Sequence, residues 1–144
     1  MSTQVEFLLL DSNSQRMNSA IASLGQLYAD YDRVLVIADK RTYLEQIDEL
    51  LWHNSSKQFI AYSLDTECYS SSAAVLLTDK QPVRTRYPTL LNIDGELPAS
   101  PEQFRNIVEL VGADEHDKEK ARERYRVYRQ LGFIVTHKLL TKNV

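Results

Sequence analysis

The feature that most constrains the fold is an alternation of short apolar runs with longer amphipathic segments. Residues 5–10 (VEFLLL) and 34–38 (VLVIA) are apolar throughout, as strands buried on both faces are. Between them, hydrophobic residues recur every three or four positions from Met17 to Tyr31, which predicts a helix. Residues 43–52 repeat that helical spacing. Strands that alternate with helices of this length predict βαβ units.

The second half of the chain continues the alternation. Four more strands are predicted from β-branched and apolar runs, over residues 59–62, 74–77, 89–93 and 133–140. Two more helices are predicted, one over 101–111 with Ser100 as its N-cap, and one over 118–131 that ends at Gly132. We therefore predict a single α/β domain over residues 1–144, with a mainly parallel sheet flanked by helices.

Glycine is missing where a nucleotide-binding fold would need it. A phosphate cradle uses glycine in the first strand–helix turn, so that backbone N–H groups can approach the oxygens. This turn reads DSNSQRM, and the four glycines of the chain follow neither the GxGxxG nor the GxxxxGK spacing. We expect a nucleotide-binding-like topology without a phosphate loop, and no cofactor.

Candidate catalytic and metal-binding residues are few. Asp11 and Asp39 each end a predicted strand, and as neighbours at one sheet edge they could bind a metal or share a proton. The alternative, which we favour, is that each caps the following helix. The three histidines lack metal-ligand spacing and are expected at the surface. Cys68, in the serine-rich segment 65–73, has no neighbouring base. We predict neither a metal site nor a catalytic site.

Cysteine usage and hydropathy indicate the cellular compartment. The single cysteine excludes an internal disulfide framework and suits a reducing environment. No apolar run approaches the roughly 20 residues that a membrane span needs. The first apolar run has no basic segment before it and soon meets an Asp, unlike a signal peptide. These features predict a cytoplasmic protein that does not contact a membrane.

Positive charge is concentrated near the C-terminus. The chain carries a net charge of −3, but residues 118–129 hold six cations and two acids, a net of +4, which leaves 11 cations and 18 acids, a net of −7, elsewhere. At about 100° per residue, five residues fall in one arc, which we predict to be the outward face of the helix and call the cationic stripe: Lys118, Arg122, Tyr125, Arg126 and Arg129. The residues expected to pack on the sheet are Ala121, Val127, Tyr128 and Leu131. Arg124 lies near that packing side and is expected to be structural.

The composition of the cationic stripe suits an acidic peptide. The alternative is that the stripe is a solvent-exposed helix face without a ligand, as charged faces commonly are. Such faces, however, usually mix positive and negative charges. Arginine binds carboxylates through a bidentate fork, and the Tyr125 ring offers an apolar wall. Together they favour a peptide that is acidic, carries an aromatic side chain and ends in a free carboxylate. Direct binding of single-stranded DNA is disfavoured because the rest of the chain is acidic.

Four stretches of the sequence carry a resemblance to a known family. They read FLLLD, YLEQIDELLWHNSSKQF, YPTLLNIDGELP followed by FRNIVELV, and ARERYRVYRQLGF. In this order they resemble the chi subunit of the bacterial DNA polymerase III holoenzyme. The resemblance implies a non-catalytic adaptor that pairs with the psi subunit of the clamp loader and binds the acidic C-terminal tail of the single-stranded DNA-binding protein. It implies only indirect contact with DNA, and a monomer or a 1:1 heterodimer.

The resemblance also implies roles for the cationic stripe. Arg122 would clamp the terminal carboxylate of the tail, and Tyr125 would line the pocket for its terminal phenyl ring. Lys118 and Arg126 would meet acidic residues upstream, and Arg129 lies on the same arc.

A second contact surface is implied by two aromatic residues. Trp52 and Phe59 match the pair that family members use to contact psi, although an amphipathic helix could instead bury Trp52 in the core. The Pro-His pair common in the family is Ala61-Tyr62 here, and the loop that follows is serine-rich. This departure leaves the identity of psi and its contacts open.

An enzyme family supplies the alternative function. Tyr128, Gly132 and Phe133 also resemble the Tyr-x-x-x-Gly-Phe closing helix of Gcn5-type N-acetyltransferases. That family binds the coenzyme A pyrophosphate with an Arg/Gln-x-x-Gly-x-Gly/Ala turn, and no Gly-x-Gly occurs in this chain. The missing turn disfavours acetyl transfer.

Overall fold

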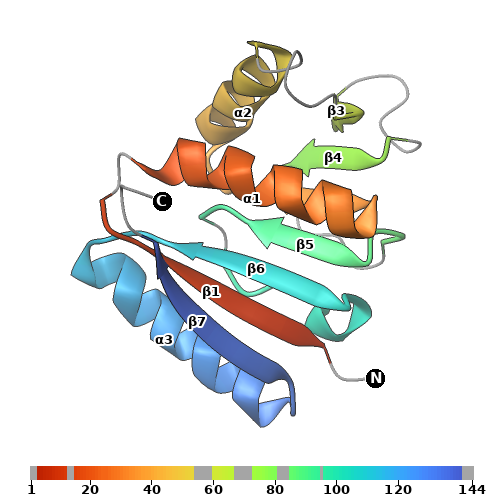
Figure 1. Ribbon diagram of the computed structural model, residues 1–144. Coiled ribbons are helices and arrows are strands. Elements are labelled where there is room, and N and C mark those ends of the chain that lie inside the picture. Colours follow the sequence, from red (N-terminus) through yellow and green to blue (C-terminus); the bar gives the residue numbers. More distant parts are fainter. Residues whose placement is uncertain are drawn as a thin grey trace.

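The computed structural model describes residues 3–12, 15–53, 60–66, 73–80, 85–94 and 96–140. They form a seven-stranded sheet in the order β3-β4-β2-β5-β6-β1-β7, and every described strand pairing is parallel (Figure 1). The strands are β1 Gln4–Leu10, β2 Val34–Ile37, β3 Tyr62–Leu64, β4 Val75–Thr78, β5 Thr89–Asn92, β6 Asn106–Val111 and β7 Ile134–Leu140. The helices are α1 Arg16–Tyr31, α2 Arg41–His53 and α3 Glu115–Gln130, with a 3-10 turn η3 at Pro101–Gln103. The predicted single-domain α/β fold is confirmed.

The helices cover both faces of the sheet. α1 and α2 pack on one face and α3 packs on the other (Figure 1). Strand β2 shows why its sequence is apolar throughout: Val34 and Val36 join the core under α1 and α2, whereas Leu35 and Ile37 join the core on the α3 side. A strand with both faces covered has no solvated side on which to place polar residues.

The segment 106–111 differs from its prediction, because it forms strand β6 and not a helix. The helix was predicted because the apolar residues of this segment fit helical spacing. β6 lies between β5 and β1, however, and five of its six residues are buried, Glu109 included. Burial on both faces removes the alternation by which a strand is recognised, so the helical spacing misled. Only the turn Pro101–Gln103 is helical in character.

The last helix is longer at its start than predicted. α3 begins at Glu115 because Asp114 caps it, accepting a 2.8 Å hydrogen bond from the backbone N–H of Asp117. It ends before Gly132, whose positive φ of 83° lies in the region that glycine adopts readily. The predicted C-terminal stop is therefore confirmed.

The remaining strand predictions differ from the structure by small shifts. β4 and β5 lie within about a residue of their predicted ranges. β3 begins at Tyr62, where the strand predicted over 59–62 was expected to end. Phe59 and Cys68 lie outside the described residues. Among the described helices, none combines the length and hydropathy required to cross a bilayer.

Candidate functional site

A buried polar cluster holds α3 on the sheet. The fully buried Tyr128 donates a 2.6 Å hydrogen bond from its hydroxyl to Glu109 Oε2, and Arg124 Nε lies 3.4 Å from the same oxygen. Burial raises the pKa of Glu109, and the Arg124 charge opposes that rise. Burial and the adjacent Glu109 raise the pKa of Tyr128. The expectation that Arg124 is structural is confirmed.

The packing side of α3 is rotated from the predicted one. Ala121 and Tyr128 are buried as expected, but Val127 is only half-buried and Leu131 is 49% exposed. Leu131 lies beyond the end of the helix, so it does not continue the packing face. The half-buried Tyr125 shares the packing instead. The prediction that Val127 and Leu131 pack on the sheet is therefore wrong.

The cationic stripe lies on a flank of α3 next to the core. Arg122, Arg126 and Arg129 are exposed, whereas Lys118 and Tyr125 are half-buried. Their helical spacing places all five residues on one flank, as predicted, but the prediction that Tyr125 lies on the outward face is wrong, because its ring packs against the core.

The Tyr125 ring joins this flank to the sheet. Its centroid lies 5.7 Å from that of Phe7 in β1, with a tilt of 45° between the rings. On its other side, the guanidinium carbon of Arg129 lies 6.0 Å from the Tyr125 centroid. The ring thus has one apolar neighbour and one cationic neighbour, which suits a ligand that carries both an apolar group and a negative charge.

Among the described residues, the exposed cations of the stripe have no acidic partner. Within the described part of the chain, no ion pair involves Lys118, Arg122, Arg126 or Arg129. In residues 118–129 the ion pair that is seen belongs to Arg124. The acidic-peptide hypothesis requires guanidinium groups that are available to a ligand, and the described residues meet that requirement.

Sequence reasoning missed Glu109 as the anchor of α3. Its signal was a single carboxylate inside the apolar run IVELV. A carboxylate buried at such a position needs a donor or a cation from the element packed above it. Here α3 supplies both.

Trp52 lies at the C-terminal end of α2 and its side chain is 73% exposed. The alternative that Trp52 is a core residue is wrong, because Leu51 is the residue of this turn that faces inward. One turn earlier, Asp48 accepts a 2.6 Å hydrogen bond at Oδ1 from the Tyr62 hydroxyl, which ties α2 to β3. Tyr62 thus fixes the position of this helix end against the sheet. Phe59, the other half of the predicted aromatic pair, is among the residues not described.

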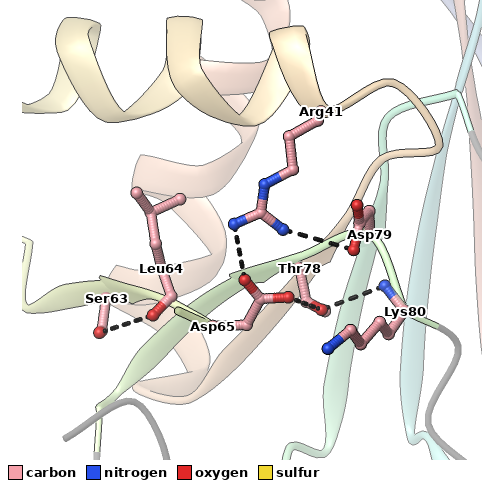
Figure 2. A network of polar contacts seen from close by, with 7 residues as sticks. All are labelled: Arg41, Ser63, Leu64, Asp65, Thr78, Asp79 and Lys80. Carbon is pink, nitrogen blue, oxygen red and sulfur yellow. Dashed lines mark hydrogen bonds and ion pairs between the residues drawn. The ribbon is translucent and has the colours of Figure 1, made fainter. Parts of the chain in front are cut away.

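A second polar network fixes the opposite end of α2, as Figure 2 shows. Arg41 lies 2.8 Å from Asp65 Oδ1 and 3.4 Å from Asp79 Oδ1. Thr78 donates a 2.7 Å hydrogen bond to Asp65 Oδ2. The hydrogen bond from Arg41 lowers the pKa of Asp65, although partial burial opposes it. The start of α2 is thereby tied to the ends of β3 and β4.

Asp11 and Asp39 are not neighbours, contrary to one prediction. Strands β5 and β6 separate the strands that they follow. Among the described residues, neither side chain accepts a hydrogen bond from the first turn of the helix that it was predicted to cap. Before α1, Gln15 Oε1 accepts from the backbone N–H of Asp11 at 2.9 Å, and before α2, Asp94 Oδ1 accepts from that of Asp39 at 2.7 Å. Burial and the nearby Asp39 raise the pKa of Asp94.

All three histidines are exposed, as predicted. No cluster that could hold a metal ion occurs in the described residues.

The carboxyl edge of the sheet carries a cavity of about 440 Å³ between the helix N-termini. The buried Arg16 reaches across this edge, donating to the Ile93 carbonyl at 2.6 Å and pairing with Asp117 at 2.9 Å. Nucleotide-binding folds hold their phosphates at the corresponding edge. Here the edge presents a guanidinium group that is already bound to the protein's own oxygens, in keeping with a turn that lacks glycine.

Comparisons with known proteins agree with the resemblance seen in the sequence. Residues 1–136 match the family described as DNA polymerase III chi subunit, HolC. The chain is 26% identical to DNA polymerase III subunit chi of Haemophilus influenzae, with 100% of this chain and 99% of the relative covered. It is 26% identical to the Pseudomonas aeruginosa subunit chi, with 91% and 92% covered. It is 28% identical to that of Escherichia coli, with 70% and 69% covered.

One solved structure shares the fold at low sequence identity. It is a chain in the crystal structure of the E. coli DEAD-box protein SrmB bound to regulator of ribonuclease activity A (RraA). The TM-score is 0.56 and the identity 14%, with 97% of this chain and 92% of that chain covered. At this identity the likeness concerns the fold alone.

Proposed function

Because the chain belongs to the DNA polymerase III chi subunit family, and so is an accessory subunit in DNA replication, we propose that it acts as a non-catalytic adaptor in the cytoplasm. In this role it links the single-stranded DNA-binding protein to the clamp loader. One surface, the cationic stripe, binds the acidic C-terminal tail of the single-stranded DNA-binding protein. A second surface, around Trp52 and Phe59, pairs with the psi subunit.

The observation that carries the tail proposal is a set of available arginines beside a half-buried ring. Arg122 clamps the terminal carboxylate through its guanidinium fork, and Tyr125 forms the wall of the pocket for the terminal phenyl ring. Lys118 and Arg126 meet acidic residues upstream, while Arg129 stacks on Tyr125 at 6.0 Å and adds positive charge. The acidic remainder of the chain disfavours nucleic acid as the ligand of this surface.

A titration of three peptides tests this proposal. We expect binding to an acidic peptide that ends in Asp-Phe with a free carboxylate. The same peptide with an amidated end should bind at least about tenfold more weakly, because the charge-assisted bonds to Arg122 are lost. A peptide that lacks the terminal Phe tests the Tyr125 wall. Equal affinity for all three peptides would contradict the assignment, and a thermal shift with acetyl-CoA instead of peptide would favour the acetyltransferase alternative.

The psi proposal is supported by the exposure of Trp52, since a large aromatic ring at the surface is typical of an interface anchor. We expect Trp52→Ala to weaken psi binding by about 2 kcal/mol or more, while tail-peptide binding is unchanged. Tyr31→Ala is the matched control, because Tyr31 is also an exposed aromatic but lies at the end of α1. If both variants weaken psi equally, the interface is not centred on Trp52.

A further inference from the structure

Strand β7, the last strand of the sheet, is an edge strand that lies beside the cationic stripe. Within the described residues it pairs only with β1, and five of its seven residues are exposed. Helix α3 runs alongside β7 (Figure 1). An edge strand presents a row of N–H and C=O groups that can pair with an added strand from another chain.

The hydrogen bonding of β7 shows which of its backbone groups point away from β1. The N–H of Ile134 donates to the Thr3 carbonyl at 3.0 Å, so this residue faces β1. Alternate residues of a strand direct their backbone groups to the same side. The groups of Val135, His137 and Leu139 therefore point outward, and we call this side of β7 the free edge.

The free edge continues the surface of the cationic stripe. The register of the β1–β7 pair aligns His137 with Phe7, on which the Tyr125 ring packs at 5.7 Å. Paired residues of a parallel ladder share a face, so His137 lies on the same face as Tyr125. Leu139 is 60% exposed and lies on the same face, two residues further along the strand. A chain that leaves the Tyr125 wall thus meets the free edge at the middle of β7.

Charge distinguishes between the candidate occupants of the free edge. Residues 118–140 contain seven Lys and Arg side chains and only two acids, Glu119 and Glu123. A second copy of the chain, paired edge to edge, would bring two such basic flanks together, and like charges repel. An extended acidic peptide has the complementary charge.

We propose that the acidic peptide bound by the cationic stripe adds to the free edge of β7 as an extra strand of the sheet. This inference rests on the proposed function and extends it. The terminal residue occupies the Arg122–Tyr125 site, and the backbone of the residues before it pairs with the outward groups of β7. Backbone pairing supplies affinity that does not depend on the peptide's side chains. The arginines bind the acidic side chains and so provide specificity.

Amide hydrogen exchange, followed by NMR with and without the Asp-Phe peptide, tests this pairing in the full chain. We expect exchange at Val135, His137 and Leu139 to slow at least about tenfold when the peptide is saturating. The N–H groups that already bond to β1, such as that of Ile134, are the internal control and should not change. Peptide binding without slowed exchange at the outward amides would overturn the inference. Slowed exchange that depends on protein concentration without peptide would also overturn it, and would indicate a second copy.

A pair of variants at one position isolates the backbone contribution. His137→Pro removes the outward N–H at a site where an edge strand tolerates proline, whereas His137→Ala removes the imidazole and keeps the N–H. We expect the proline variant to bind the peptide roughly threefold to tenfold more weakly than the alanine variant. Equal affinities would overturn the inference. If the proline variant does not fold, the exchange measurement on the unmodified chain decides. A failure of the unmodified chain to bind any acidic peptide would overturn the proposed function, and this inference with it.

Discussion

The hydroxyl of Tyr128 provides a quantitative test of how α3 is held. Tyr128→Phe keeps the ring and its packing but removes the 2.6 Å bond to Glu109 Oε2, in a site where both side chains are fully buried. A buried acceptor that loses its donor costs about 1–3 kcal/mol, because water cannot replace the lost bond. For a chain of this length we expect the Tm to fall by roughly 3–10 °C. Urea unfolding, followed by circular dichroism at neutral pH, measures the free-energy change directly.

Tyr125→Phe is the matched control, because it makes the same change one turn earlier on the same helix. The Tyr125 hydroxyl makes no hydrogen bond within the described residues, so we expect a change in unfolding free energy of less than about 0.5 kcal/mol. Equal losses for the two variants would show that the cost comes from helix repacking. A neutral Tyr128→Phe would refute the reasoning that the buried carboxyl group depends on this donor.

Four more predictions concern the charged groups. Arg122→Ala should weaken tail-peptide binding by about 1.5–3 kcal/mol, with Arg105→Ala, an exposed arginine elsewhere, as the control in calorimetry. The affinity of the unmodified chain for the tail peptide should fall as salt rises, because salt screens exposed ion pairs. A salt-independent affinity would indicate a mainly apolar pocket. Burial raises the folded-state pKa of Glu109 above its ordinary value of 4.5, so the contribution of Glu109 to stability should decline as pH rises above about 4.5. Urea unfolding across pH 4.5–8 should show that Glu109→Gln removes this decline. Parallel pH profiles of the variant and the unmodified chain would contradict the prediction. Because Arg41 lowers the folded-state pKa of Asp65 below 3.8, its stabilising contribution should be lost as pH falls below about 4, and Asp65→Asn should flatten the acid limb of the same profile.

The contrast between the two pH predictions tests the electrostatic reasoning as a whole. Glu109 is desolvated at the centre of the sheet, whereas Asp65 is held by an arginine at the sheet edge. The two carboxyl groups therefore shift in opposite directions and act in separate pH ranges. If both variants changed the same limb of the pH profile, one of the two assignments would be wrong.

The wrong prediction of a helix over residues 106–111 shows where reasoning from neighbouring residues alone fails. In α1 one face is solvated, so the spacing of its apolar residues predicted the buried Ala20, Leu24 and Leu27 directly. In β6 both faces are covered, and nothing in the run IVELV separates a strand from a helix. The partners that allow Glu109 to be buried in this run come from α3 and are separated from it by 15 or more residues, so the run itself does not show them.

The candidate site likewise combines features that the local sequence predicts with features that only packing on the sheet decides. The helical repeat of about 100° per residue was enough to gather the five residues of the cationic stripe on one arc. The rotation of α3, which turns Tyr125 toward Phe7, follows from contacts with the sheet that no local pattern encodes.

Most of the helices and strands, the charge contrast and the makeup of the cationic stripe were determined by the sequence alone, because each depends on residues close together in the chain. The parallel sheet followed from the alternation of these elements, but the identity of β6 did not. Strand order, the distance between Asp11 and Asp39, the exposure of Trp52 and the position of the stripe beside the free edge of β7 were decided only by the tertiary structure. These properties depend on which distant segments pair. Such pairing is set by the burial of both sheet faces together, and not by the preference of any one segment.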